Sequence, residues 1–139
     1  MKSVADRRAR VARVRNVQHL QATMVAEEAR ARVVDLETNA GRLAEMRGAL
    51  APGAGLTSGA ALGGARELMA RLENAERSLA GSIATARINA QARQQEKLEA
   101  RIAQEGADKL EARAVHALQE SIEQRLAAIH RVRPKETNR

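Results

Sequence analysis

Three histidines, His19, His116 and His130, have the widest chemical range in this chain, because imidazole can ligate a metal or transfer protons. Two imidazoles share one metal from a helix when they lie three or four residues apart, and no pair among the three has that spacing. The chain contains no cysteine, so it offers neither a thiolate nucleophile nor a cysteine-based zinc site. We therefore expect no metal site and no catalytic histidine.

A glycine-rich segment and adjacent carboxylates are the other features that could carry chemistry. Residues 51–59 read Ala-Pro-Gly-Ala-Gly-Leu-Thr-Ser-Gly and lack the Gly-Lys-Ser/Thr ending with which a P-loop holds phosphates. Glu27 and Glu28 are most simply charges on a helix surface, with Arg30 and Arg32 close by. The sequence predicts a protein that is not an enzyme and has no cofactor.

The composition explains why an active site is not expected. Among 139 residues there are 24 Lys+Arg, 17 Asp+Glu and no Phe, Trp or Tyr. A globular core without any aromatic ring is improbable, because aromatic rings dominate most cores. A chain rich in Ala, Glu, Arg, Gln and Leu is typical of a long helix or coiled coil. The first ten residues are charged where a signal peptide is apolar, and no apolar run approaches a membrane span, so we expect a cytoplasmic protein.

Proline and glycine divide the chain into two long helical stretches. Pro52 and Pro134 are the only prolines, and neither fits inside a helix. A short turn makes two successive helices antiparallel neighbours. We therefore predict an all-α fold, an antiparallel two-helix coiled-coil hairpin with a longer second helix, as one elongated domain over 1–139. Its parts are a helix over about 3–50, a turn over 51–58, a helix over about 58–132 and a basic tail over 133–139.

Apolar residues at three- and four-residue steps predict the seam between the helices. In the first helix they are Val4, Val11, Val14, Val17, Leu20, Met24, Val25, Val33, Leu36, Leu43, Met46 and Leu50. In the second helix they are Leu62, Ala65, Leu68, Leu72, Ala75, Leu79, Ile83 and Ala86. If the chain folds back at the short turn, facing residues have numbers that sum to about 108, so that Leu36 faces Leu72.

This register leaves the last part of the second helix without a partner from about residue 105 onward. The overhang carries an apolar stripe of heptad character, formed by Val115, Leu118, Ile122 and Ile129. Such a stripe predicts partner binding or self-association. The alternative is a kinked first helix, or a second helix that folds back at a hinge near Gly106.

Basic residues gather at the end of the predicted hairpin that lies away from the turn. Residues 1–15 carry a net charge of +5 and residues 131–139 a net charge of +3, out of +7 for the chain. A basic binding surface and a merely solvated pair of chain ends both explain this distribution. Nucleic acid is disfavoured as the partner, because no aromatic side chain is present to stack on bases. The candidate binding residues are Arg7, Arg8, Arg10, Arg13, Arg131 and Arg133.

The segment Arg-Val-Ala-Arg-Val-Arg-Asn-Val-Gln-His-Leu-Gln-Ala over 10–22 resembles the opening of the FliJ family of flagellar export proteins and their type III secretion relatives. Gly-Leu-Thr-Ser over 55–58 is similar to the loop between that family's two helices, and Arg-Pro-Lys over 133–135 is similar to its basic tail. The resemblance spans the whole chain. It implies an antiparallel two-helix coiled coil similar to the stalk of rotary ATPases.

The resemblance also implies partners. The terminal end of the hairpin would sit in the central pore of a hexameric export ATPase and promote assembly of that ring. The part near the loop would contact the membrane export gate, and export chaperones would be further partners, so that the protein works at the inner face of the membrane. Family members use aromatic residues for the gate, and this chain has none. The residues that would stand in for them are Leu68, Leu72, Ala75 and Leu79. A structural coiled-coil adaptor with no more specific role is the alternative.

Overall fold

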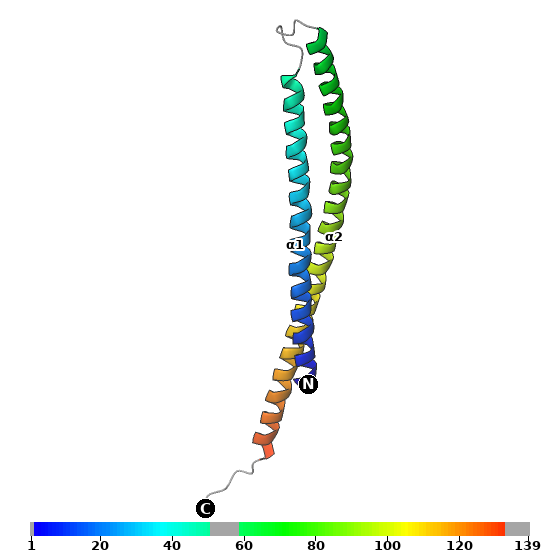
Figure 1. The fold of residues 1–139 in the computed structure, drawn as a ribbon. Coiled ribbons are helices and arrows are strands. Elements are labelled where there is room, and N and C mark those ends of the chain that lie inside the picture. Colours follow the sequence, from blue (N-terminus) through cyan, green and yellow to red (C-terminus); the bar gives the residue numbers. More distant parts are fainter. Residues whose placement is uncertain (1, 51–58, 133–139) are drawn as a thin grey trace, which may run out of the picture. The chain divides into compact units, whose positions relative to one another are not determined.

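A computed structural model of the chain describes residues 2–50 and 59–132. It contains the helices α1 (Lys2–Ala49) and α2 (Gly59–Val132), and no strand is present in these two ranges (Figure 1). The predicted all-α, antiparallel hairpin with a longer second helix is confirmed. The predicted turn over 51–58 and basic tail over 133–139, with Arg133, lie outside the described residues. Because α2 runs without interruption through Gly106, the predicted alternative of a third, folded-back helix is wrong.

The chain divides into two packed units, each made from a stretch of both helices. One unit is Thr23–Glu96, here called the 23–96 unit. The other joins Met1–Ala22 with Lys97–Arg139 and is here called the terminal unit. The division follows from the hairpin, since antiparallel neighbours bring the start of one helix to the end of the other. The single domain predicted over 1–139 stays a prediction.

Leucine packing forms the best-buried part of the 23–96 unit. Leu36 of α1 is 8% exposed and Leu72 of α2 is 9% exposed. The leucine row of α1 continues at the half-buried Leu43 and Leu50, seven residues apart, and Leu79 of α2 follows Leu72 at the same interval. A seven-residue repeat keeps one face of each helix against its partner, which is the basis of coiled-coil packing.

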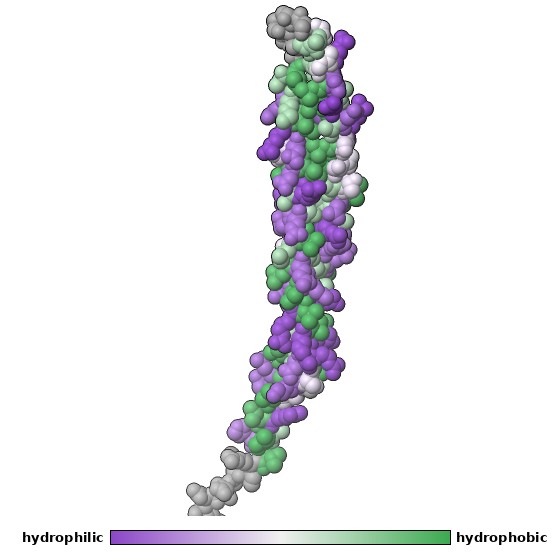
Figure 2. Space-filling model, in the orientation of Figure 1, coloured by the Kyte–Doolittle hydropathy of each residue, from purple (hydrophilic) through white to green (hydrophobic). Residues whose placement is uncertain are grey.

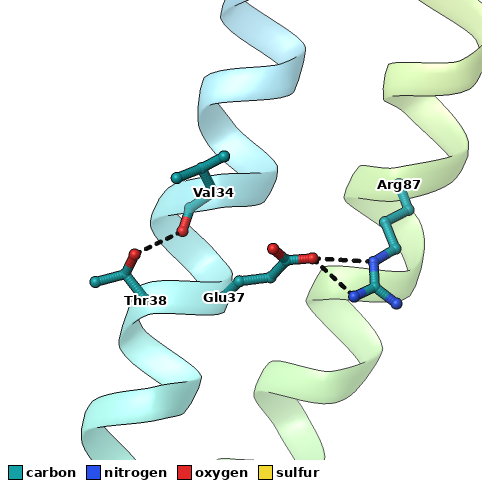
Figure 3. Close-up of polar contacts among 4 residues, drawn as sticks. All are labelled: Val34, Glu37, Thr38 and Arg87. Carbon is teal, nitrogen blue, oxygen red and sulfur yellow. Dashed lines mark hydrogen bonds and ion pairs between the residues drawn. The ribbon is translucent and has the colours of Figure 1, made fainter.

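Two sets of ion pairs join the helices across the 23–96 unit. Arg47 lies 3.5 Å from Glu73 and 3.2 Å from Glu76, measured between guanidinium nitrogen and carboxylate oxygen. Arg87 of α2 donates hydrogen bonds of 2.7 and 3.3 Å to one oxygen of Glu37 on α1 (Figure 3). All five side chains are partly exposed, so these pairs contribute more to alignment than to stability.

The polar contacts correct the predicted register. In the 23–96 unit the residue numbers of the paired side chains sum to between 120 and 124. In the terminal unit the side-chain amide of Gln104 donates a 2.8 Å hydrogen bond to Asn16, and these numbers sum to 120. The predicted sum of about 108 is therefore wrong. That register would place Arg47 opposite Ala61, where no carboxylate is available, instead of opposite Glu73 and Glu76.

The seam of α1 is lined by alanine rather than by valine. Ala5, Ala12, Ala26 and Ala29 are buried, whereas eight predicted seam residues are exposed: Val4, Val11, Val14, Val17, Leu20, Met24, Val25 and Met46. The phase of the helix explains the correction. Continued at seven-residue steps, the row through Val4 and Val11 reaches Arg32, whereas the row through Ala5 and Ala12 reaches Val33. The alanine row is polar only at His19 between Ala5 and Val33, whereas the valine row is polar at Gln18 and again at Arg32.

The α2 side of the predicted seam is partly confirmed. Leu72 is buried, and Ala65, Leu79, Ile83 and Ala86 are half-buried. The predicted seam residues Leu62, Leu68 and Ala75 are exposed. Leu68 and Ala75 lie outside the seven-residue rows that run through Ala65 and Leu72 and through Met69 and Ile83. Leu62 lies on the second row, one step before Met69 and near the start of α2.

The unpaired part of α2 is shorter than predicted. Buried or half-buried positions recur through Ala107, Ala114, Leu118 and Ser121. Every residue over 122–132 is exposed. The expectation that the overhang begins near residue 105 is therefore wrong, because the true register pairs α1 with a later part of α2.

We predict that Leu72→Ala lowers the free energy of unfolding by about 2 kcal/mol, at the low end of the range for buried leucine because the seam is only two helices thick. The matched control is Leu68→Ala, one helical turn away at a side chain that is 44% exposed, for which we expect a loss of about 0.5 kcal/mol or less. Urea unfolding followed by circular dichroism measures both. Equal losses would place Leu68 in the seam and contradict this packing.

Candidate functional site

The first turns of α1 form a basic surface, here called the basic end and defined by Arg7, Arg8, Arg10 and Arg13. All four side chains are exposed. Arg10 donates a 3.4 Å hydrogen bond from Nε to the backbone carbonyl of Asp6, which leaves the Asp6 carboxylate unused. None of the four arginines forms an ion pair with another residue in the described ranges.

Five of the arginines farther along both helices behave differently. Arg47, Arg71, Arg87, Arg93 and Arg101 each lie within 4 Å of a glutamate oxygen. The charge of these five is therefore balanced locally. Other described arginines also form no ion pair with a described residue: Arg15, Arg30, Arg32, Arg42, Arg66, Arg77, Arg113, Arg125 and Arg131. The basic end differs from them in its density, with four unpaired arginines between positions 7 and 13. Unbalanced positive charge on an exposed helix attracts an acidic partner and speeds its association. Arg131, the other described member of the predicted basic set, is exposed near the end of α2.

The predicted apolar stripe on α2 is present, and the structure separates its members. Val115 lies beside the paired part of the helix, and Leu118 is half-buried on the side that faces α1. Ile122 is 47% exposed and Ile129 is 61% exposed, both on the last described turns. Figure 2 shows hydrophobic surface on these turns, next to the grey atoms of the terminal segment. Val115, Ile122 and Ile129 are therefore exposed to a partner, whereas Leu118 is half-buried.

The four residues predicted to replace an aromatic gate contact do not share one exposed face. Leu72 is buried and Leu79 is half-buried in the seam. Leu68 and Ala75 are exposed and lie seven residues apart on α2. A partner at this part of the hairpin would thus reach Leu68 and Ala75 but not Leu72.

An open groove in the 23–96 unit is a feature that the sequence reasoning missed. Small polar side chains of α2 line one wall, and Arg32 and Leu36 of α1 line the other. Ser82 and Thr85 each donate a hydrogen bond to the backbone carbonyl four residues earlier, so both hydroxyl protons are used within the helix. The sequence pattern that could have revealed this groove is the spacing of Ser78, Ser82, Thr85 and Asn89, whose four- and three-residue steps place them on one helix face. The groove holds no cluster of groups that could do chemistry.

The polar part of the seam was also missed. Asn16 and Gln104 bond to each other between the helices of the terminal unit. A polar pair at the contact face favours one register over its neighbours. The apolar pattern does not single out either residue, because Val14 and Val17 flank Asn16 and Ile102 lies two residues before Gln104.

The three histidines lie apart along the chain, at positions 19, 116 and 130. His116 lies 3.6 Å from Glu120, one turn along the same exposed helix face. Across residues 2–50 and 59–132, no group of three or more His, Asp or Glu side chains could hold a metal ion. The helices in these ranges contain no segment apolar and long enough to cross a membrane.

Comparison with known proteins gives no family assignment. No protein-family model, no curated protein and no solved structure matches this chain. The arguments for function therefore rest on the basic end and on the exposed stripe.

We predict that replacing Arg13 by Gln leaves the free energy of unfolding unchanged, because Arg13 has no ion pair with a described residue. Arg47→Gln removes the same charge and breaks two contacts with glutamates, so it should cost up to about 1 kcal/mol. Thermal unfolding at low and high salt tests both, and the loss at Arg47 should shrink as salt rises. A loss at Arg13 that matches the loss at Arg47 would mean that the basic end serves folding.

Proposed function

We propose that this chain is a non-enzymatic stalk component of a flagellar or related type III protein export apparatus. In this proposal the terminal unit binds in the central pore of a hexameric export ATPase and promotes assembly of the ring. The proposal draws its partner from the resemblance of residues 10–22 to the FliJ family. The observation that carries it is the basic end, where four exposed arginines have no carboxylate partner in the described ranges.

The fold supports the proposal in a second way. An antiparallel pair of helices presents the start of α1 and the last turns of α2 within one unit. The basic end and the exposed isoleucines of α2 therefore belong to the same part of the molecule. An acidic pore with apolar patches would fit both features, because charge speeds the encounter and apolar burial then provides affinity.

Contact with an export gate is a second part of the same proposal. Leu68 and Ala75 are the members of the predicted set that a partner can reach without opening the seam. We propose that any gate contact uses these two residues in place of aromatic ones. Binding of export chaperones and a place at the inner face of the membrane follow from the resemblance in the same way.

The decisive experiment measures binding of the full chain to a purified hexameric export ATPase. We predict co-purification at low salt and faster ATP hydrolysis as the ring assembles. The triple change Arg7→Gln, Arg8→Gln and Arg13→Gln should weaken binding about tenfold and flatten its salt dependence. The matched control, Arg42→Gln with Arg66→Gln and Arg77→Gln, removes the same charge from exposed sites of the 23–96 unit and should change binding less than about twofold.

Two outcomes would overturn the proposal. Absence of binding at low salt would remove the ATPase as a partner. Equal weakening by the two triple variants would show that net charge alone drives binding, without a contribution from the basic end.

A further inference from the structure

The last turns of α2 carry an apolar stripe that no described part of the chain covers. Ile122, Leu126, Ile129 and Val132 follow one another at steps of four, three and three residues, so they share one side of the helix. Their exposure rises along the helix, from 47% at Ile122 to 79% at Val132. We call these four residues the terminal stripe.

The terminal stripe adjoins and prolongs an established interface. On α2 one row of seam positions runs through Gln104, Glu111 and Leu118 at seven-residue steps, and two further steps lead to Arg125 and Val132. Val132 is the stripe residue on this row, and Ile122 follows the half-buried Ser121, so the terminal stripe borders the face that packs against α1. The Asn16–Gln104 register places the start of α1, at Lys2, across from Leu118. Beyond that level no described residue of α1 lies across from the face.

We propose that a second copy of this chain covers the terminal stripe, with residues 119–132 of the two copies running antiparallel. In this arrangement Ile122 of one copy lies opposite Ile129 of the other, and Leu126 lies next to the twofold axis. The isoleucines are seven residues apart, so both Ile122–Ile129 layers form at once. Val132 of the second copy reaches the level of Gln119, which is one residue beyond the level of Lys2 at the start of α1. The incoming helix therefore packs on the part of α2 that follows its contact with α1.

Charge favours the antiparallel orientation over the parallel one. In residues 119–132 the acidic side chains, Glu120 and Glu123, come first, and the basic side chains, Arg125 and Arg131, come last. An antiparallel pair brings the acidic half of each copy beside the basic half of the other, whereas a parallel pair brings like charges together. Arg125 lies beside the stripe near the twofold axis, so its charge keeps the association weak and concentration-dependent.

The positions that border the stripe support a helical partner. Gln119, Ser121 and Ala128 lie beside it and carry no charge. At these three positions a second helix can approach without desolvating an ion, whereas at Arg125 it cannot. On the opposite side of the helix, Gln124 and Ala127 are exposed and polar or small, which makes them suitable control positions.

Sedimentation of the full chain over a range of concentrations tests the surface. We expect the mass to rise from 15.0 kDa toward twice that value as concentration increases. Ile122→Glu with Ile129→Glu should hold the protein at the monomer mass at every concentration. The control Gln124→Glu with Ala127→Glu adds the same two charges to the opposite side and should dimerise like the unmodified chain, with equal helicity by circular dichroism in all three proteins.

Disulfide trapping tests the orientation, since the natural chain has no cysteine. A mixture of the Ile122→Cys and Ile129→Cys proteins should form a mixed disulfide under mild oxidation. Neither protein alone should do so, because in the antiparallel pair identical positions are offset by seven residues, about 10 Å along the helix and beyond the reach of a disulfide.

Three results would overturn the proposal. They are a monomer at all concentrations, a dimer that the stripe variant does not affect, and a disulfide formed by Ile129→Cys alone, which indicates a parallel pair. These experiments need only this chain, so their failure leaves the export ATPase proposal standing, and failure of ATPase binding leaves the dimer standing. If both hold, the ATPase and the second copy compete for Ile122 and Ile129.

Discussion

The packing of alanine against the facing helix is the constraint on which this structure depends. Ala5, Ala12, Ala26 and Ala29 are buried in the seam, and a methyl group is the largest side chain they present. Small seam residues let two helices approach closely, but each contact removes little apolar surface from water. The hairpin therefore gains its stability from many small contacts, with Leu36 and Leu72 as the main exceptions.

Because each apolar contact buries little surface, the polar contacts determine how the two helices are aligned. Arg47 reaches two glutamates, Arg87 reaches Glu37, and Asn16 bonds to Gln104. A sliding movement of one helix by a single heptad would preserve much of the alanine packing but would break every one of these contacts. The polar contacts thus select one register among several that the apolar pattern permits.

The helices could be predicted from the sequence because their signals are local. The absence of aromatic residues, the placement of Pro52 and the helix-forming composition all act within a few turns. The register and the seam could not be predicted in the same way, because both depend on which residues meet across the hairpin. Valine is more apolar than alanine, so the sequence predicts Val11 inside. Its row carries Gln18 and Arg32, whereas the row through Ala12 is polar only at His19 before it reaches Val33. The clustering of arginines at the basic end could be predicted from the sequence. Whether carboxylates of α2 pair with these arginines depends on the register, so the absence of such pairs among the described residues could not be predicted.

The alanine rows also bear on how such a protein can diverge. At Ala5, Ala12, Ala26 and Ala29 any larger side chain would push the helices apart, so selection on size is strict there. At the exposed positions between them many residues serve equally well, and substitutions can accumulate without loss of the fold. Descendants of a common ancestor would then keep a spacing of small residues while losing nearly all identity. In a protein of this kind, the spacing of small residues along the seam would therefore outlast amino-acid identity as a sign of common ancestry.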